Sequence, residues 1–136
     1  MFAQGKYKIP FNLDQWSGYL AERKRFYRAT SSSTNRIVYS GDSHNAWASN
    51  LRSEDGSILA AEYAGTSVSS SGLENFIRHI SPDFVAAGFR AANPDLLYTN
   101  TKNRGYLLNR LTHEKHSVRP TYVLFPDDSP DKGKEE

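Results

Sequence analysis

The chain contains no cysteine among its 136 residues. Disulfide bridges and thiolate metal sites are therefore excluded for this chain, and the redox compartment cannot be inferred from cysteine usage. Methionine is scarce as well, with a single residue, so eight tyrosines and seven phenylalanines supply much of the expected core. A hydrophobic share of 38% indicates a folded domain rather than a disordered segment.

Long apolar runs and a strong excess of one charge are also missing. No run approaches the roughly 20 residues that a membrane-spanning helix needs, and the N-terminus has no apolar signal-peptide core, so we expect no membrane partner and assign no compartment. The formal net charge is only +2. The one dense basic cluster, Arg23-Lys24-Arg25 with Arg28, is interpreted as a solvated helix face, with a nucleic-acid surface as the weaker alternative.

The hydrophobic periodicity predicts an α/β (α+β-like) chain, with one mixed sheet of about four strands and two to three flanking helices. One helix runs from an Asp14 cap to Ala29, where Gly18 allows a late start, and another begins at Pro82. A short helix is expected over 73–80. The expected strands cover 36–40, 58–64, 106–111 and 117–124, whereas 43–52 and 93–103 are interpreted mainly as loops. Residues 1–125 are expected to form a single domain, followed by a disordered polar tail over 126–136.

The most informative segment follows the first expected strand. The β-branched run from Ile37 to Tyr39 stops at Gly41, and Asp42 and His44 follow one residue apart. In open α/β sheets, ligands bind at the carboxyl ends of the strands. Carboxylate and imidazole groups are common metal ligands, so these two residues indicate a metal site, with a turn-capping aspartate beside a hydrogen-bonded histidine as the alternative.

A set of strings in a fixed order resembles the C-terminal part of the PhoD-like alkaline phosphatase/phosphodiesterase family. This family is a branch of the calcineurin-like metallophosphoesterases. The strings cover about residues 12 to 112, and they are Asp14-Gln15-Trp16-Ser17-Gly18-Tyr19 with Ala21-Glu22-Arg23, Gly41-Asp42-Ser43-His44-Asn45-Ala46-Trp47-Ala48, Ala61-Glu62-Tyr63-Ala64-Gly65-Thr66-Ser67-Val68-Ser69-Ser70, Asn93-Pro94 and Arg104-Gly105-Tyr106-Leu107.

The resemblance implies hydrolysis of phosphate mono- or diesters at a cluster of iron and calcium ions, in an often exported family. It implies Asp42 and His44 as metal ligands, with His44 also in a catalytic role. Tyr19 and Trp47 are the candidates for substrate binding. Their alternatives are a stripe position of the first helix for Tyr19 and ordinary packing for Trp47.

The family's earlier metal-binding motifs have no counterpart in this chain. We therefore expect the C-terminal segment of a sandwich-type phosphatase domain, inactive alone, whose exposed sheet face is covered by a partner chain or by a second copy. The alternative is a non-catalytic interaction module that keeps the fold segment with a vestigial metal site.

Three further features have open interpretations. The glycine- and serine-rich stretch 65–72 is either a phosphate cradle at a helix start or an ordinary N-capped loop. Glu62 is either a partner that orients His44 or a solvent-facing residue. His113 and His116 are expected to be exposed turn residues.

Overall fold

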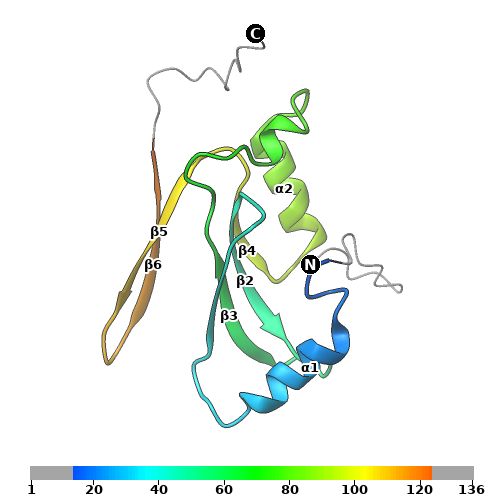
Figure 1. The fold of residues 1–136 in the computed structure, drawn as a ribbon, viewed down its shortest axis with the longest axis vertical. Helices are drawn as coiled ribbons and strands as arrows, with labels where there is room; N and C mark the ends of the chain where they lie inside the picture. The colour runs from blue at the N-terminus through cyan, green and yellow to red at the C-terminus, as the bar shows by residue number, and fades with distance from the viewer. Residues whose placement is uncertain (1–13, 124–136) are drawn as a thin grey trace.

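A mixed four-stranded sheet forms the centre of the computed structural model, which describes residues 14–123 (Figure 1). The strands are β1 (Ile37–Ser40), β2 (Ala46–Arg52), β3 (Ile58–Ala64) and β4 (Leu96–Asn100), and their order in the sheet is β1-β3-β2-β4. β1 and β3 are parallel, whereas β2 is antiparallel to both of its neighbours. The predicted fold class is confirmed. The expected tail over 126–136 lies outside the described residues.

Two of the strands in this sheet correct the sequence-based expectation. β2 lies in a segment interpreted mainly as a loop, and β4 lies in a stretch interpreted entirely as a loop. Neither has a strong β-branched run or a regular alternation of apolar and polar side chains. β2 becomes a strand because β3 and β4 flank it on both sides and take up its backbone hydrogen bonds.

The predicted hairpin is present but does not join the central sheet. It consists of β5 (Gly105–Leu111) and β6 (His116–Tyr122), which form a second, two-stranded sheet. The β6 boundary corrects the expected strand, which began one residue later and ended two residues later. Because the hairpin pairs only with itself, it attaches to the central sheet through side chains.

The helices are α1 (Leu20–Ala29) and α2 (Pro82–Ala92). α1 begins six residues after Asp14, because the intervening residues form turns and Tyr19 provides no side-chain cap. α2 follows the expected signals: Ser81 Oγ accepts a hydrogen bond of 3.2 Å from the Phe84 amide, and Pro82 occupies the first helical position. The expected helix over 73–80 is wrong, since only the 3-10 helix η1 (Leu73–Asn75) forms there.

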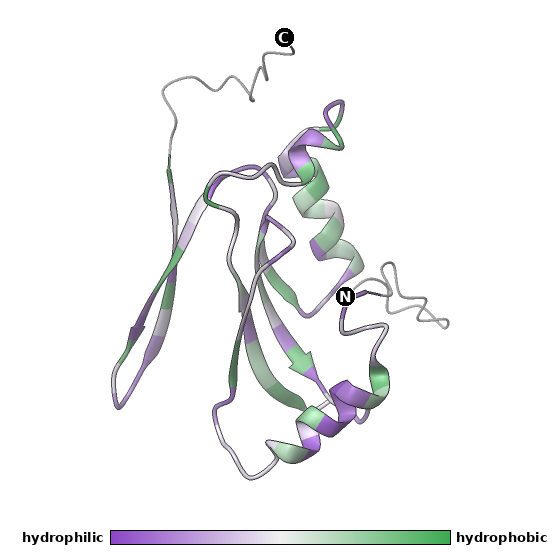
Figure 2. Cartoon of the chain, viewed as in Figure 1, coloured by the Kyte–Doolittle hydropathy of each residue, from purple (hydrophilic) through white to green (hydrophobic). Residues whose placement is uncertain are grey.

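The helices and the hairpin lie on opposite faces of the central sheet (Figure 1). On the helix face, the Trp47 ring packs edge-on against Phe89 of α2 at 5.4 Å. On the hairpin face, the hydroxyls of Tyr98 and Tyr122 form a hydrogen bond between β4 and β6. Figure 2 shows that α1 is largely hydrophilic, whereas α2 and the central strands are more apolar.

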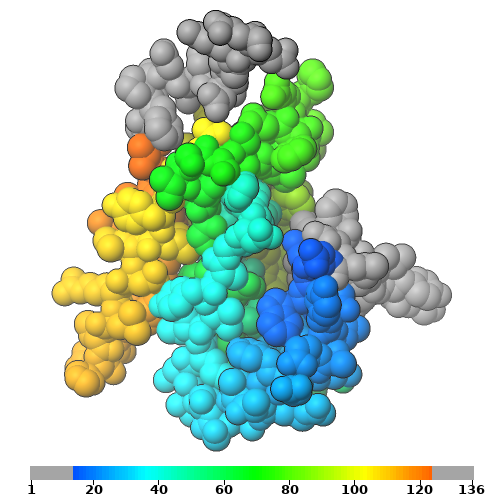
Figure 3. Space-filling model, in the orientation of Figure 1, coloured from blue at the N-terminus to red at the C-terminus, as the bar shows by residue number. Residues whose placement is uncertain are grey.

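The core of the described structure is small. Its buried hydrophobic residues are all alanines, and no large side chain between residues 14 and 123 is fully buried; these alanines are Ala46, Ala60, Ala64 and Ala86. Large apolar side chains are instead exposed on both helices and on the hairpin, which projects from one side of the molecule (Figure 3). Within the same residues, neither helix has the length and the apolar character needed to cross a membrane.

Candidate metal-binding loop

The candidate site lies where the two parallel strands end. Because β1 and β3 run in the same direction, the loops that follow them, over 41–45 and 65–72, leave the same edge of the sheet. The two loops are in direct contact, since Thr66 Oγ1 donates a hydrogen bond of 3.0 Å to the His44 carbonyl. Thr66 Oγ1 is also 3.0 Å from the Asn103 carbonyl, which brings a third segment to this edge. The predicted position of the Asp42 and His44 segment at the strand ends is confirmed.

The backbone of the 41–45 loop is strained at the two residues that the sequence selects. Asp42 has a φ of 68° and His44 a φ of 55°, and among the described non-glycine residues only Asn35 shares a positive φ. Between them, the Ser43 amide donates a hydrogen bond of 2.8 Å to the Gly41 carbonyl. Left-handed backbone costs about 1–2 kcal/mol per residue, and such strain concentrates at functional sites. The strain therefore supports a functional role for this loop.

The His44 imidazole is oriented by the neighbouring loop. Its Nδ1 lies 2.8 Å from the carbonyl oxygen of Ser71. A carbonyl oxygen can only accept, so Nδ1 carries the hydrogen and donates it, and Nε2 keeps its lone pair. His44 is exposed, and a carbonyl that holds the other ring nitrogen is the usual support of a metal-binding histidine. Glu62 does not have this orienting role, because Ser71 is the partner of Nδ1; the Glu62 carboxylate accepts a hydrogen bond of 2.7 Å from Ser40 Oγ.

Hydrogen bonds of Trp47 and Asn45 hold the 41–45 loop in place on its buried side. The indole nitrogen of Trp47 donates a hydrogen bond of 2.6 Å to Ser43 Oγ, while its ring packs on α2. Asn45 is buried, and its Oδ1 accepts from the Leu73 amide at 3.3 Å. These contacts give Trp47 a packing role beside the loop, and a contact between Trp47 and substrate stays a prediction.

Tyr19 lies apart from this loop. It precedes α1, which lies beside the opposite end of the central sheet (Figure 1). Its hydroxyl donates a hydrogen bond of 3.1 Å to the Asp14 carboxylate, and this contact raises the pKa of Tyr19. The structure thus places Asp42, His44 and Trp47 together and leaves Tyr19 elsewhere, so its role in substrate binding also stays a prediction.

The basic cluster of α1 is partly neutralised by acidic neighbours. Lys24 pairs with Glu54 at 2.6 Å, and Arg25 pairs with Glu22 at 3.6 Å. Both pairs are largely exposed. This arrangement is that of a solvated face, in agreement with the preferred interpretation of the sequence.

The 65–72 loop does not form an anion cradle. The amide of Gly72 donates to Glu74 Oε1 at 3.0 Å, and the amide of Leu73 donates to Asn45. The donors at the start of η1 therefore already have acceptors, and one of these acceptors is a carboxylate that would repel phosphate. A Cβ on Gly72 would approach the His44 carbonyl oxygen to 2.7 Å, so glycine is needed there for close packing. This loop supports the site rather than binding phosphate through these amides.

Two residues near the loops, Arg104 and Glu74, have no role predicted from the sequence. Arg104 and Glu74 form an ion pair of 3.4 Å, and Arg104 Nε donates to the Ser70 carbonyl at 3.0 Å. The only sequence signal was the place of Arg104 in one of the ordered strings.

The interpretation of His116 as an exposed turn residue is wrong: it is half-buried at the start of β6, with Nε2 3.0 Å from the Tyr39 hydroxyl.

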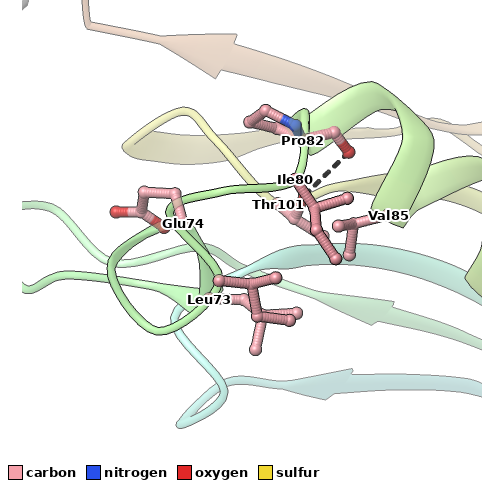
Figure 4. A pocket seen from close by; sticks show the side chains of 7 residues that line it. Leu73, Glu74, Ile80, Pro82, Val85 and Thr101 are labelled. Atoms are coloured by element: carbon pink, nitrogen blue, oxygen red, sulfur yellow. Dashed lines mark hydrogen bonds between the residues drawn. The ribbon is translucent and has the colours of Figure 1, made fainter.

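A small apolar pocket lies beside the site, between η1 and α2 (Figure 4). Figure 4 shows aliphatic side chains converging on it, while the Glu74 carboxylate points away. Thr101 Oγ1 donates a hydrogen bond of 3.2 Å to the Pro82 carbonyl oxygen. The lining residues are Leu73, Ile77, Ile80, Pro82, Val85 and Thr101, together with Glu74. This lining does not suit a metal ion.

The donor atoms of the 41–45 loop fit part of a metal site. His44 offers Nε2 with a fixed tautomer, and Asp42 is an exposed carboxylate on the same turn. Between residues 14 and 123, however, no group of three or more His, Cys, Asp or Glu side chains is placed to hold a metal ion. Hydrolytic metal sites use three or more protein ligands, so these two residues alone would not make up such a site.

A family model described as PhoD-like phosphatase matches residues 2–119. The chain belongs to the PhoD-like phosphatase family. It is 31% identical over 122 residues to alkaline phosphatase D of Bacillus subtilis (strain 168), and this match covers 85% of the chain and 20% of that relative. A solved structure of PhoD matches with a TM-score of 0.50 and 28% identity, over 69% of this chain and 18% of that one. The chain thus spans about a fifth of the length of these PhoD-like relatives.

Proposed function

We propose that this chain supplies part of the metal site of a PhoD-like phosphatase, with Asp42 and His44 as metal ligands. The observation that carries this proposal is the His44 imidazole, whose Nδ1 is held at 2.8 Å by the Ser71 carbonyl while Nε2 is left free. The strained backbone at both residues supports it as well. The phosphatase family points to phosphate esters as the substrate class.

In such a site, bound metal ions acidify a water molecule and stabilise the charge that develops on the phosphoryl oxygens. Iron and calcium are the metals we propose. The residues of this chain would bind and orient: Asp42 would provide a hard oxygen ligand, and His44 would provide a neutral nitrogen ligand. The Ser71 carbonyl keeps the His44 ring in the tautomer that binding requires.

We further propose that the chain is a single, partial domain over residues 1–125 and that it does not hydrolyse phosphate esters alone. Its match to only about a fifth of the PhoD-like relatives supports this. The two candidate ligands on the 41–45 loop also fall short of the three or more that hydrolytic sites use. The remaining ligands would come from outside the described residues.

The exposed apolar side chains support a partner chain that completes the domain. Phe84 of α2 is 72% exposed, and Leu97 of β4 is 63% exposed on the neighbouring edge strand. Trp16 and Phe26 form a further exposed aromatic pair at 5.9 Å near α1. Burial of such side chains stabilises by about 1.5–3 kcal/mol each, which favours association. A polypeptide that carries the earlier part of a PhoD-like domain is the partner we propose.

The metal role is tested by calorimetry of the purified chain with calcium and with iron salts. We expect measurable binding that Asp42→Asn weakens and His44→Ala abolishes. The matched control is His113→Ala, which removes an exposed histidine at the turn between β5 and β6. Equal binding by the His44→Ala chain, or equal loss in the control, would contradict the assignment.

Activity is tested separately with p-nitrophenyl phosphate and its bis ester. We expect no metal-dependent hydrolysis by the chain alone. Hydrolysis that Asp42→Asn abolishes would show that this chain holds a complete site, and it would refute the proposed dependence on a partner.

A further inference from the structure

The Ser71 carbonyl belongs to a piece of backbone that one ion pair holds from both sides. On the preceding residue, the Ser70 carbonyl accepts a hydrogen bond of 3.0 Å from Arg104 Nε. On the following residue, the Gly72 amide donates to Glu74 Oε1 at 3.0 Å. Arg104 Nη2 lies 3.4 Å from the same Glu74 oxygen. Arg104 therefore holds the peptide group that precedes the one receiving the imidazole, and Glu74 holds the receiving peptide group itself, which consists of the Ser71 carbonyl and the Gly72 amide.

The Arg104 and Glu74 pair is the least exposed of the ion pairs in the described structure. Its side chains are 21% and 19% exposed, against 38% and 21% for Arg52 and Asp95 and more than half for both partners of the Lys24 and Glu54 pair. Water therefore screens this pair less. The planar guanidinium also donates hydrogen bonds to two acceptors at once, the Ser70 carbonyl and the Glu74 carboxylate. A lysine side chain cannot reach both acceptors in one geometry.

Arg104 is itself anchored at the base of the β5–β6 hairpin. Its carbonyl accepts a hydrogen bond of 2.9 Å from the Val123 amide, and the next amide, of Gly105, donates to the Ser67 carbonyl at 2.9 Å. A Cβ on Gly105 would come within 2.1 Å of the Thr121 carbonyl oxygen, so the backbone at this position cannot shift freely. The hairpin base thus holds Arg104 against the 65–72 loop.

We infer that Arg104, paired with Glu74, is a positioning residue for His44. It acts through the Ser71 carbonyl: it holds this acceptor in place and so keeps the hydrogen of the neutral imidazole on Nδ1. The inference rests on the proposed function in one respect only, namely that the free Nε2 of His44 binds a metal ion. Removal of Arg104 releases the carbonyl and shifts the neutral imidazole of His44 toward the Nε2–H form.

The test is a 15N NMR measurement of the His44 ring in the full chain without metal, at a pH where the imidazole is neutral. The chain has four histidines, and the spectrum of His44→Ala identifies the His44 signals. We expect the Nδ1–H form in the unmodified chain and a mixture of both forms in Arg104→Ala. Arg104→Lys keeps the positive charge and the aliphatic part of the side chain, so it preserves folding. It retains one of the two contacts of Arg104, so we expect a partial shift of the His44 tautomer.

The matched control is Arg52→Ala. Arg52 pairs with Asp95 at 2.6 Å and donates to the Gly56 carbonyl at 2.7 Å, so it makes the same kinds of contact at the other end of the sheet. It should leave the His44 tautomer unchanged. An unchanged tautomer in both Arg104 variants, or an equal shift in the control, refutes the inference.

This readout is independent of metal binding. A tautomer shift confined to the Arg104 variants supports the positioning role even when calorimetry detects no metal, in which case only the proposed function fails. Conversely, metal binding with an unchanged tautomer in the Arg104 variants refutes the positioning role and leaves the proposed function intact.

Discussion

The hydroxyl of Tyr39 lies 3.0 Å from Nε2 of His116, although 77 residues separate them in the chain. The imidazole also packs edge-on against the rings of Tyr39 and Tyr63, with centroids at 6.0 Å and 5.4 Å. This contact joins the start of β6 to β1 and β3, while the Tyr98 and Tyr122 hydroxyls join its end to β4. Side-chain contacts of His116 and of Tyr122 thus hold the hairpin against the central sheet.

His116→Ala should remove the contact of the hairpin with Tyr39 and Tyr63. Each of the two ring pairs contributes about 0.5–1.5 kcal/mol and the hydrogen bond about 1 kcal/mol, so we expect a loss of about 2–4 kcal/mol in the free energy of unfolding. Urea unfolding measures the loss, and amide hydrogen exchange should quicken in β5 and β6 first. His113→Ala, in the exposed turn between these strands, should change neither; an equal effect there would contradict the docking role.

Gly72→Ala should destabilise the candidate site by overpacking. The added Cβ would lie 2.7 Å from both the His44 carbonyl oxygen and Glu74 Oε2, which predicts a loss of about 1–3 kcal/mol in the free energy of unfolding. Gly88→Ala is the matched control, because its Cβ would meet nothing within 4 Å inside α2. It should stabilise by about 0.5–1 kcal/mol. Thermal unfolding of both variants distinguishes the two effects, and destabilisation by Gly88→Ala alone would contradict this account.

Stability should fall at alkaline pH because of Tyr122. Burial, and then the hydrogen bond with Tyr98, raise the pKa of Tyr122 above its ordinary value of 10.0. A phenol whose pKa is raised by folding contributes stability that is fully present below pH 10.0 and is lost as the pH rises toward the folded-state pKa. Urea unfolding across this range measures the loss. Tyr122→Phe should reduce this pH dependence, whereas Tyr106→Phe, on the exposed side of β5, should retain it.

Asp42→Gly should raise stability at the expense of metal binding. Glycine adopts the φ of 68° without strain, so we expect a gain of about 1 kcal/mol in the free energy of unfolding. Asn35→Gly relieves a similar φ of 52° in the loop before β1 and serves as the control. Both variants should melt at a higher temperature, and only Asp42→Gly should weaken calcium binding in calorimetry. Destabilisation by Asp42→Gly would show that no strain is stored at this position.

The sequence allowed the fold class, the hairpin and the start of α2 to be predicted, because local patterns carry these features. Ser81 and Pro82 mark the start of α2, and the β-branched run before Gly41 marks β1. β4 could not be found in this way, because it pairs with residues of β2 that precede it by about fifty positions in the chain. A distant partner also acts at η1, where a longer helix was expected, since Asn45 accepts from the Leu73 amide across 28 positions of the chain.

By itself, the sequence determined the residue types and the order of the motif, a strand end followed by Asp42 and His44, because strand and turn preferences act over a few neighbours. Only the tertiary structure decided how the motif is supported. The partners of His44 in space are Ser71 and, indirectly, Glu74 and Arg104, which hold the peptide group of the Ser71 carbonyl and the one before it. These contacts exist because the parallel pairing of β1 with β3 brings their following loops to one edge, and no local pattern encodes that meeting.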